Sequence, residues 1–122
     1  MELFSQDKQR IVLERERGHT LQAIALRRGI SYQRVQTIVR EAREHIDRLE
    51  MHLLVSRKEG VAFGLAIPNQ EQQYRAIALD YLAWILDRLR ARDLDIEVTT
   101  KNTSEGIIVF LEDQTNYSEE EE

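Results

Sequence analysis

The fold is decided by one stretch, Thr20-Leu-Gln-Ala-Ile-Ala-Leu-Arg-Arg-Gly-Ile-Ser-Tyr-Gln-Arg-Val-Gln-Thr-Ile-Val-Arg40. Thr20 can cap a short helix over residues 21–28. Gly29 can end that helix, because glycine readily adopts the positive φ of a tight turn. Ser31 can then cap a further helix. The stretch therefore predicts two helices joined by a turn of three residues.

Six residues of this stretch have the size and spacing with which two short helices pack at a steep angle. Ala25 is small enough to lie where the second helix crosses the first, and Gly29 allows the turn between them. The remaining four are apolar side chains that would be buried between the helices: Ile24, Ile30, Val35 and Ile38. This combination is typical of a helix-turn-helix, which places its second helix in the major groove of duplex DNA.

The segment resembles the fourth region of primary bacterial sigma factors and the related LuxR-type regulators. The resemblance covers roughly residues 3–50 and rests on these motifs: Gly18-His-Thr-Leu-Gln-Ala-Ile-Ala25, Gly29-Ile-Ser31, Arg34-Val35, Ile38 and Glu41-Ala-Arg43. It implies a helical DNA-binding module of a bacterial or phage protein. A complete sigma factor is not expected, because no region resembles one that binds core polymerase. From Gly60 onward we identify no resemblance to a family, so the resemblance implies nothing about the biological role of the whole chain.

The helix expected in the groove has a polar side opposite Val35 and Ile38. Glutamine and arginine can form paired hydrogen bonds with base edges, each worth about 1–3 kcal/mol of discrimination. We therefore expect four residues to read bases: Gln33, Gln36, Thr37 and Arg40. Phosphate contacts fix the register of a protein on DNA without reading its sequence. Seven residues are expected to make them: His19, Arg27, Arg28, Ser31, Tyr32, Arg34 and Arg43.

Charge divides the chain into two unlike halves. Residues 1–58 carry twelve Lys and Arg against eight Asp and Glu, whereas residues 59–122 carry five against fourteen. The net charge of −5 is therefore that of a basic half of +4 joined to an acidic half of −9. Because only the surface that faces phosphates must be positive, this division suits DNA binding by the first half. The acidic half predicts a modest non-specific affinity.

The rest of the first half also reads as helical. Ser5 can cap a helix over residues 6–17, which Gly18 would end. Residues 31–56 contain neither Gly nor Pro, and apolar residues recur there in alternating steps of four and three: Val35, Val39, Ala42, Ile46, Leu49 and Leu53. This heptad-like spacing predicts one long helix whose seam faces a partner chain, or a break near residues 44–47 followed by a fourth helix packed on its own domain.

The second half reads as a mixture of helix and strand. An apolar run over residues 61–67 is a short strand or a buried linker, and it marks the expected domain boundary. Asn69 can cap a strong helix over residues 70–92. Residues 95–101 alternate apolar and polar side chains, and residues 106–111 form a β-branched run. The turn-like segment between them predicts a β-hairpin.

The predicted fold class is α+β. It comprises a helix-turn-helix domain over residues 1–58 with a long connecting helix, an α+β domain over 59–114 and a disordered acidic tail over 115–122. The helix of the second domain is apolar around most of its circumference, and a small sheet cannot cover it. We therefore expect a homodimer or a higher oligomer. Six residues are expected in its interface: Ile46, Leu49, Leu53, Tyr81, Trp84 and Ile85.

The sequence predicts neither an enzyme nor a cofactor. The chain has no Cys, and its five Gly form no phosphate-binding loop. Glu41, His45 and His52 share one side of a helix at spacings of four and seven residues. With no HExxH motif, this group is expected to be a solvated helix face, and we predict no metal site.

These observations favour a sequence-specific transcriptional regulator that binds double-stranded DNA and can also contact RNA polymerase. One alternative is a DNA-packaging subunit of a phage, similar to a small terminase, which would assemble as a ring of more than four subunits. The other is a module that binds polymerase or a sigma factor and never contacts DNA. With no signal peptide and no membrane-length apolar run, we expect a cytoplasmic protein.

Overall fold

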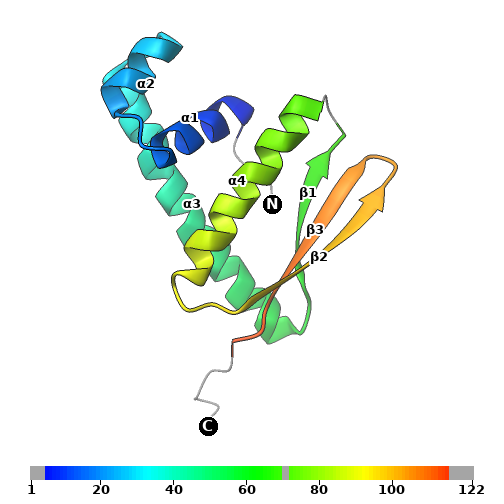
Figure 1. The fold of residues 1–122 in the computed structure, drawn as a ribbon. Helices are drawn as coiled ribbons and strands as arrows, with labels where there is room; N and C mark the ends of the chain where they lie inside the picture. Colours follow the sequence, from blue (N-terminus) through cyan, green and yellow to red (C-terminus); the bar gives the residue numbers. More distant parts are fainter. Residues whose placement is uncertain (1–4, 70–71, 116–122) are drawn as a thin grey trace.

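The computed structural model describes residues 5–69 and 72–115 and contains four helices and a three-stranded antiparallel sheet in that part of the chain (Figure 1). The helices are α1 (Gln6–Glu16), α2 (Leu21–Arg28), α3 (Tyr32–Glu59) and α4 (Gln72–Arg90). The strands are β1 (Phe63–Pro68), β2 (Ile96–Thr103) and β3 (Gly106–Asp113). The predicted α+β class is confirmed.

The three N-terminal helices begin where the sequence predicts them. The side chain of Ser5 accepts a hydrogen bond from the Lys8 amide at the start of α1. Thr20 and Ser31 do the same for the third amide of α2 and of α3, at 3.1 and 3.0 Å. Each hydroxyl therefore satisfies a backbone donor that the helix itself leaves unpaired.

Helix α3 is continuous over 28 residues. It ends at Gly60, whose backbone is left-handed with φ 74° and ψ 26°. No break occurs near residues 44–47, so the alternative of a separate fourth helix there is wrong. The apolar seam of α3 is buried inside the chain, against α1, α4 and the sheet, and not against a partner chain.

The sheet has the strand order β1-β3-β2, and both pairings are antiparallel. Strands β2 and β3 form the predicted hairpin. At its turn, Thr103 donates a hydrogen bond from its hydroxyl to the Gly106 carbonyl at 2.9 Å and accepts one from the Gly106 amide at 3.1 Å. The apolar run that could be a strand or a linker is a strand, since Leu65 pairs with Val109 in the register of β1 and β3.

Both predicted domains contribute to one hydrophobic cluster. It extends from Ile11 and Ile24 in the first half to Ile85 and Leu111 in the second. Helix α1 packs against α4 as well as α3, so that α4 is covered by α1, by α3 and by one face of the sheet (Figure 1). The surfaces that the sequence left uncovered on α4 are therefore largely covered within one chain.

The six residues expected in an oligomer interface lie inside this fold instead. Five of them are at most 2% exposed and belong to the core: Ile46, Leu49, Leu53, Tyr81 and Ile85. The sixth, Trp84, is half-buried and donates a hydrogen bond to Glu16 of α1. The spacing of apolar residues predicts that one side of a helix is buried, but it does not say whether the same chain or a partner chain covers that side. Here the same chain covers it.

Two sequence expectations concern membranes and the acidic tail. In the described residues, no helix combines the length and hydrophobicity that crossing a bilayer requires.

The expected tail falls almost wholly on residues 116–122, which lie outside the described residues. Thr115 is described, and its hydroxyl accepts a hydrogen bond from the Asp95 amide at 3.0 Å.

Candidate nucleic-acid interface

The two short helices of the deciding stretch pack through the residues that the sequence singled out. Ile24 and Val35 are fully buried, and Ile38 and Ala25 are 2% and 7% exposed. Gly29 has φ 68° and ψ 33°, and its amide and that of Ile30 both donate to the Ala25 carbonyl. The left-handed turn thus ends α2 and redirects the chain so that α3 can pack across it.

The polar side of α3 remains accessible beyond this packing. Gln33, Gln36 and Arg40 are exposed, and Thr37 is half-buried. Figure 1 shows that α2 and the first turns of α3 project away from the β-sheet. The four predicted base-reading residues therefore lie on one projecting segment of helix. Nothing from the described residues covers Gln33, Gln36 or Arg40.

Residues expected to contact phosphates lie at the start of α3 and along its side. Tyr32 is 42% exposed, and Arg34 and Arg43 are exposed. Ser31 is also exposed, but its hydroxyl is already the cap of α3. The free amides at the start of a helix attract anions, so this end of α3 can hold a phosphate beside Arg34. Arg43 lies nine residues further along, on the opposite side of α3, where it lines a pocket between α1, α3 and α4.

The other expected phosphate contacts belong to a network centred on Glu14. This carboxylate is only 8% exposed and pairs with both Arg28 and Arg27. Arg27 also lies 3.4 Å from the Nδ1 atom of His19. Arg28 is half-buried, so its main role in this fold is to hold α2 against α1. Arg27, with about half of its side chain exposed, remains accessible to a ligand.

Sequence reasoning did not single out Leu26. Its side chain has the highest exposed fraction, 86%, among the large hydrophobic residues that the structure describes. The signal was present, because Ala25 faces α3 and a residue one position further along a helix is turned by about 100° away from it. A leucine in that position has no packing partner within its own helix pair and offers an apolar contact beside Arg27.

Two histidines of α3, which the sequence places on a solvated helix face, differ in their surroundings. His45 is buried, and its Nδ1 lies 3.3 Å from the Tyr81 hydroxyl. Burial lowers the pKa of His45 to about 4, with a smaller contribution from the charge of Arg48. His52 stacks on Phe63. In the part of the chain that the structure describes, no three metal-ligating side chains form a group.

Comparison with known proteins leaves the interface to be interpreted from its own geometry. No family model matches the chain, and no curated protein or solved structure matches it significantly.

Proposed function

We propose that this chain binds duplex DNA sequence-specifically through the first half of α3 and thereby regulates transcription. The observation that supports the proposal is the packing around Ala25 and Gly29, which buries one side of α3 while the side bearing Gln36 and Arg40 stays exposed. The major groove of B-DNA is about 12 Å wide and admits one α-helix. A projecting helix with a polar outer side has the form that such a groove accepts.

In this arrangement the groove is read by amide and guanidinium groups. Gln33 and Gln36 can each bind the N6 and N7 edge of adenine, and Arg40 can bind O6 and N7 of guanine. These three side chains are spaced at steps of three and four residues, so they lie on one side of α3. They can therefore contact successive bases along one groove.

Phosphate contacts would set the register of the helix in the groove. Arg34 and the free amides at the start of α3 face one strand in this proposal, and Arg27 from α2 faces the backbone nearby. The acidic second half of the chain would stay away from the duplex, because its net charge of −9 is repelled by phosphates. Non-specific binding is then weak, and specificity depends on the base contacts.

A homodimer remains part of this proposal, but its interface would lie on a surface other than the six residues first expected there, because those pack within one chain. Two-fold pairing places two groove-reading helices about 34 Å apart and predicts an inverted-repeat operator. The mass of the native particle tests this part of the proposal separately from DNA binding.

The experiment is selection of bound duplexes from a random pool, followed by affinity measurements on the enriched sequence with wild type, Gln36→Ala and Arg40→Ala. The control is Lys58→Ala, which removes an exposed charge from the far end of the same helix. Lys58 lies 18 residues beyond Arg40, a distance of about 27 Å along the helix axis at 1.5 Å per residue.

We expect each groove variant to relax the preference at one base position and to lose about 1–3 kcal/mol of discrimination there. Lys58→Ala should keep the wild-type preference. If neither variant changes any base preference, these residues do not read bases. If the protein enriches no sequence and shifts no duplex at low salt, the proposal of DNA binding is refuted.

A further inference from the structure

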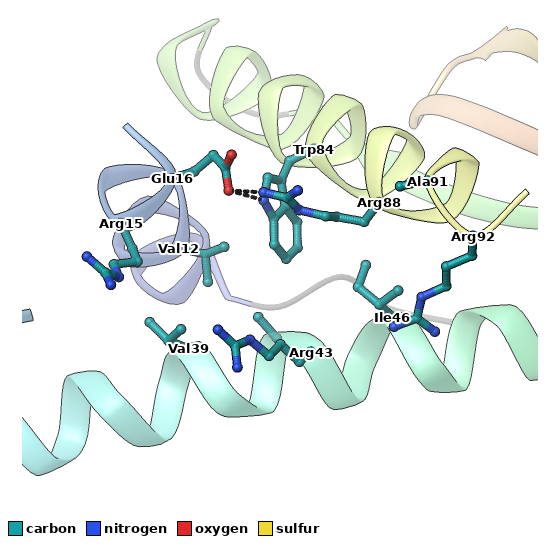
Figure 2. A pocket seen from close by; sticks show the side chains of 11 residues that line it. Val12, Arg15, Glu16, Val39, Arg43, Ile46, Trp84, Arg88, Ala91 and Arg92 are labelled. Carbon is teal, nitrogen blue, oxygen red and sulfur yellow. Dashed lines mark hydrogen bonds and ion pairs between the residues drawn. The ribbon is translucent and has the colours of Figure 1, made fainter. Parts of the chain in front are cut away.

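We propose that the pocket between α1, α3 and α4 binds a small organic anion with an aromatic or branched apolar body. The pocket has a volume of about 700 Å³ (Figure 2). This value lies within the range of about 300–1,000 Å³ found for small-molecule sites. It differs from the groove-reading surface in position and in chemistry, and its occupancy does not depend on the function proposed above.

The walls of the pocket provide an apolar slot. Val12 comes from α1, Val39 and Ile46 come from α3, and the indole of Trp84 from α4 extends toward them (Figure 2). Three aliphatic side chains opposite one flat aromatic ring favour a ligand that is itself flat or branched. Tyr81 stacks on the Trp84 ring and Arg88 lies over it, so a ligand of this kind would meet the edge of the indole together with the methyl groups.

The charge of the lining selects for an anion. Four arginines and one glutamate line the pocket: Arg15, Arg43, Arg88, Arg92 and Glu16. The guanidinium of Arg88 pairs with Glu16 and lies over the Trp84 ring, 5.6 Å from its centroid. These contacts hold the wall in place before any ligand arrives.

Two of the remaining arginines are also held by the fold. Arg92 pairs with Asp47 at 2.8 Å and with Glu50 at 2.7 Å, and these bonds keep its pKa above the ordinary arginine value. Arg15 donates to the backbone carbonyl of His19 at 3.1 Å. A guanidinium has five N–H donors, so each of these two side chains keeps donors that could bind a ligand.

Arg43 is the group that would bind the anion directly. It is exposed, and no carboxylate of the described residues pairs with it. A carboxylate can accept two parallel hydrogen bonds from one guanidinium, which is the strongest pairing available to an arginine side chain. The ligand that fits is therefore an aromatic or branched carboxylate whose apolar body lies against the edge of Trp84 and whose charge meets Arg43.

The test is a titration of the full chain, without DNA, with phenylacetate. Binding is monitored by the indole N–H signal of Trp84 in two-dimensional NMR spectra. Trp84 is the only tryptophan, so its indole signal reports on this pocket without further assignment. The neutral comparison is 2-phenylethanol, which keeps the ring and loses the charge. We expect a saturable shift with phenylacetate and at least tenfold weaker binding of the alcohol.

Arg43→Gln should weaken phenylacetate binding at least fivefold. The matched control is Arg34→Gln, because Arg34 lies nine residues earlier and thus on the opposite side of α3. An unshifted starting position of the indole signal shows that each variant keeps the fold around Trp84. The proposal is overturned by any of three results: no saturable shift, equal affinity for the alcohol, or unchanged affinity in Arg43→Gln. Because no DNA is present, these results are independent of the DNA-binding tests.

Discussion

The carboxylate of Glu14 pairs with the guanidinium of Arg28, and this contact joins α1 to the last turn of α2. Glu14 is 8% exposed, so its charge depends on the arginine for compensation. Arg27 approaches the same carboxylate at 3.4 Å but keeps about half of its side chain in solvent. The two neighbouring arginines therefore have different roles, although the sequence suggests the same one for both.

Arg28→Gln should lower the free energy of unfolding by about 1–3 kcal/mol, because it leaves a buried carboxylate with weaker pairing. Arg27→Gln should lower it by less than about 0.5 kcal/mol, since exposed ion pairs contribute little. Under the proposed function, Arg27→Gln should instead reduce DNA affinity about threefold to tenfold at low salt. Urea unfolding and fluorescence anisotropy measure the two effects. Equal losses of stability in both variants would contradict this division of roles.

Gly29→Ala should destabilise the protein by about 1 kcal/mol, because a Cβ atom is unfavourable at positive φ. The added methyl group meets no atom within 4 Å, so the cost is conformational and not steric. Gly29→Asn is the matched variant, because asparagine tolerates the left-handed region better than alanine. We expect urea unfolding to rank the two variants with Asn the more stable. The reverse order would mean that the turn in solution differs from the one described.

Gly106→Ala should be the more damaging glycine replacement in the sheet. Gly106 has φ 151°, and a Cβ atom there would lie 2.2 Å from the Ile67 carbonyl oxygen. Because this contact is with backbone, the end of the β1–β3 pairing must move, at a cost of about 2–3 kcal/mol. Gly64→Ala is the control, since its nearest atom would be Phe110 Cε1 at 3.6 Å, an ordinary contact. Its unfolding free energy should stay within about 0.5 kcal/mol of wild type.

The free energy of unfolding should decrease as the pH falls, because His45 is buried in its neutral form. Its pKa is lowered to about 4 in the folded chain, chiefly by burial, whereas histidine in an unfolded chain has a pKa of about 6.5. The unfolded state therefore binds a proton that the folded state excludes. The stabilisation is complete above about pH 6.5 and is lost as the pH falls toward about 4. Between pH 7.5 and pH 5 this group should remove about 2 kcal/mol.

His45→Gln is expected to reduce that loss, because glutamine does not titrate. Urea unfolding at both pH values measures the difference between the variant and wild type. His52→Gln serves as the comparison, since His52 is an exposed histidine on the same helix. A variant at position 45 with the wild-type pH dependence would show that the buried imidazole is not its source.

The local features of the first half could be predicted because each depends on residues close in sequence. A hydroxyl three residues before an unpaired amide caps a helix, as Thr20 and Ser31 do. Glycine at the end of α2 adopts positive φ at Gly29 as expected. The exposed side of α3 followed from the same periodicity that identified its buried side.

The packing of α1 on α4 could not be predicted, because its contacts join residues far apart in sequence. Trp84 donates to Glu16 across 68 residues, and Arg17 lies 3.8 Å from Asp80. Nothing in the local pattern around either partner identifies the other. The same limit applies to the pocket, whose arginines come from α1, α3, α4 and the turn that follows α4, and of which only Arg43 was named from the sequence, as a phosphate contact.

The unbroken length of α3 has a mechanical consequence. A helix of 28 residues is about 42 Å long, and this one carries the proposed groove readers at one end while the other end packs on the sheet. Because the helix is continuous, its two ends move together. A tilt of about 10° at the sheet end would displace the opposite tip by about 7 Å, or about two base-pair steps of duplex DNA. If α3 reads DNA as proposed, a small rearrangement in the acidic half would therefore change which bases the tip can reach.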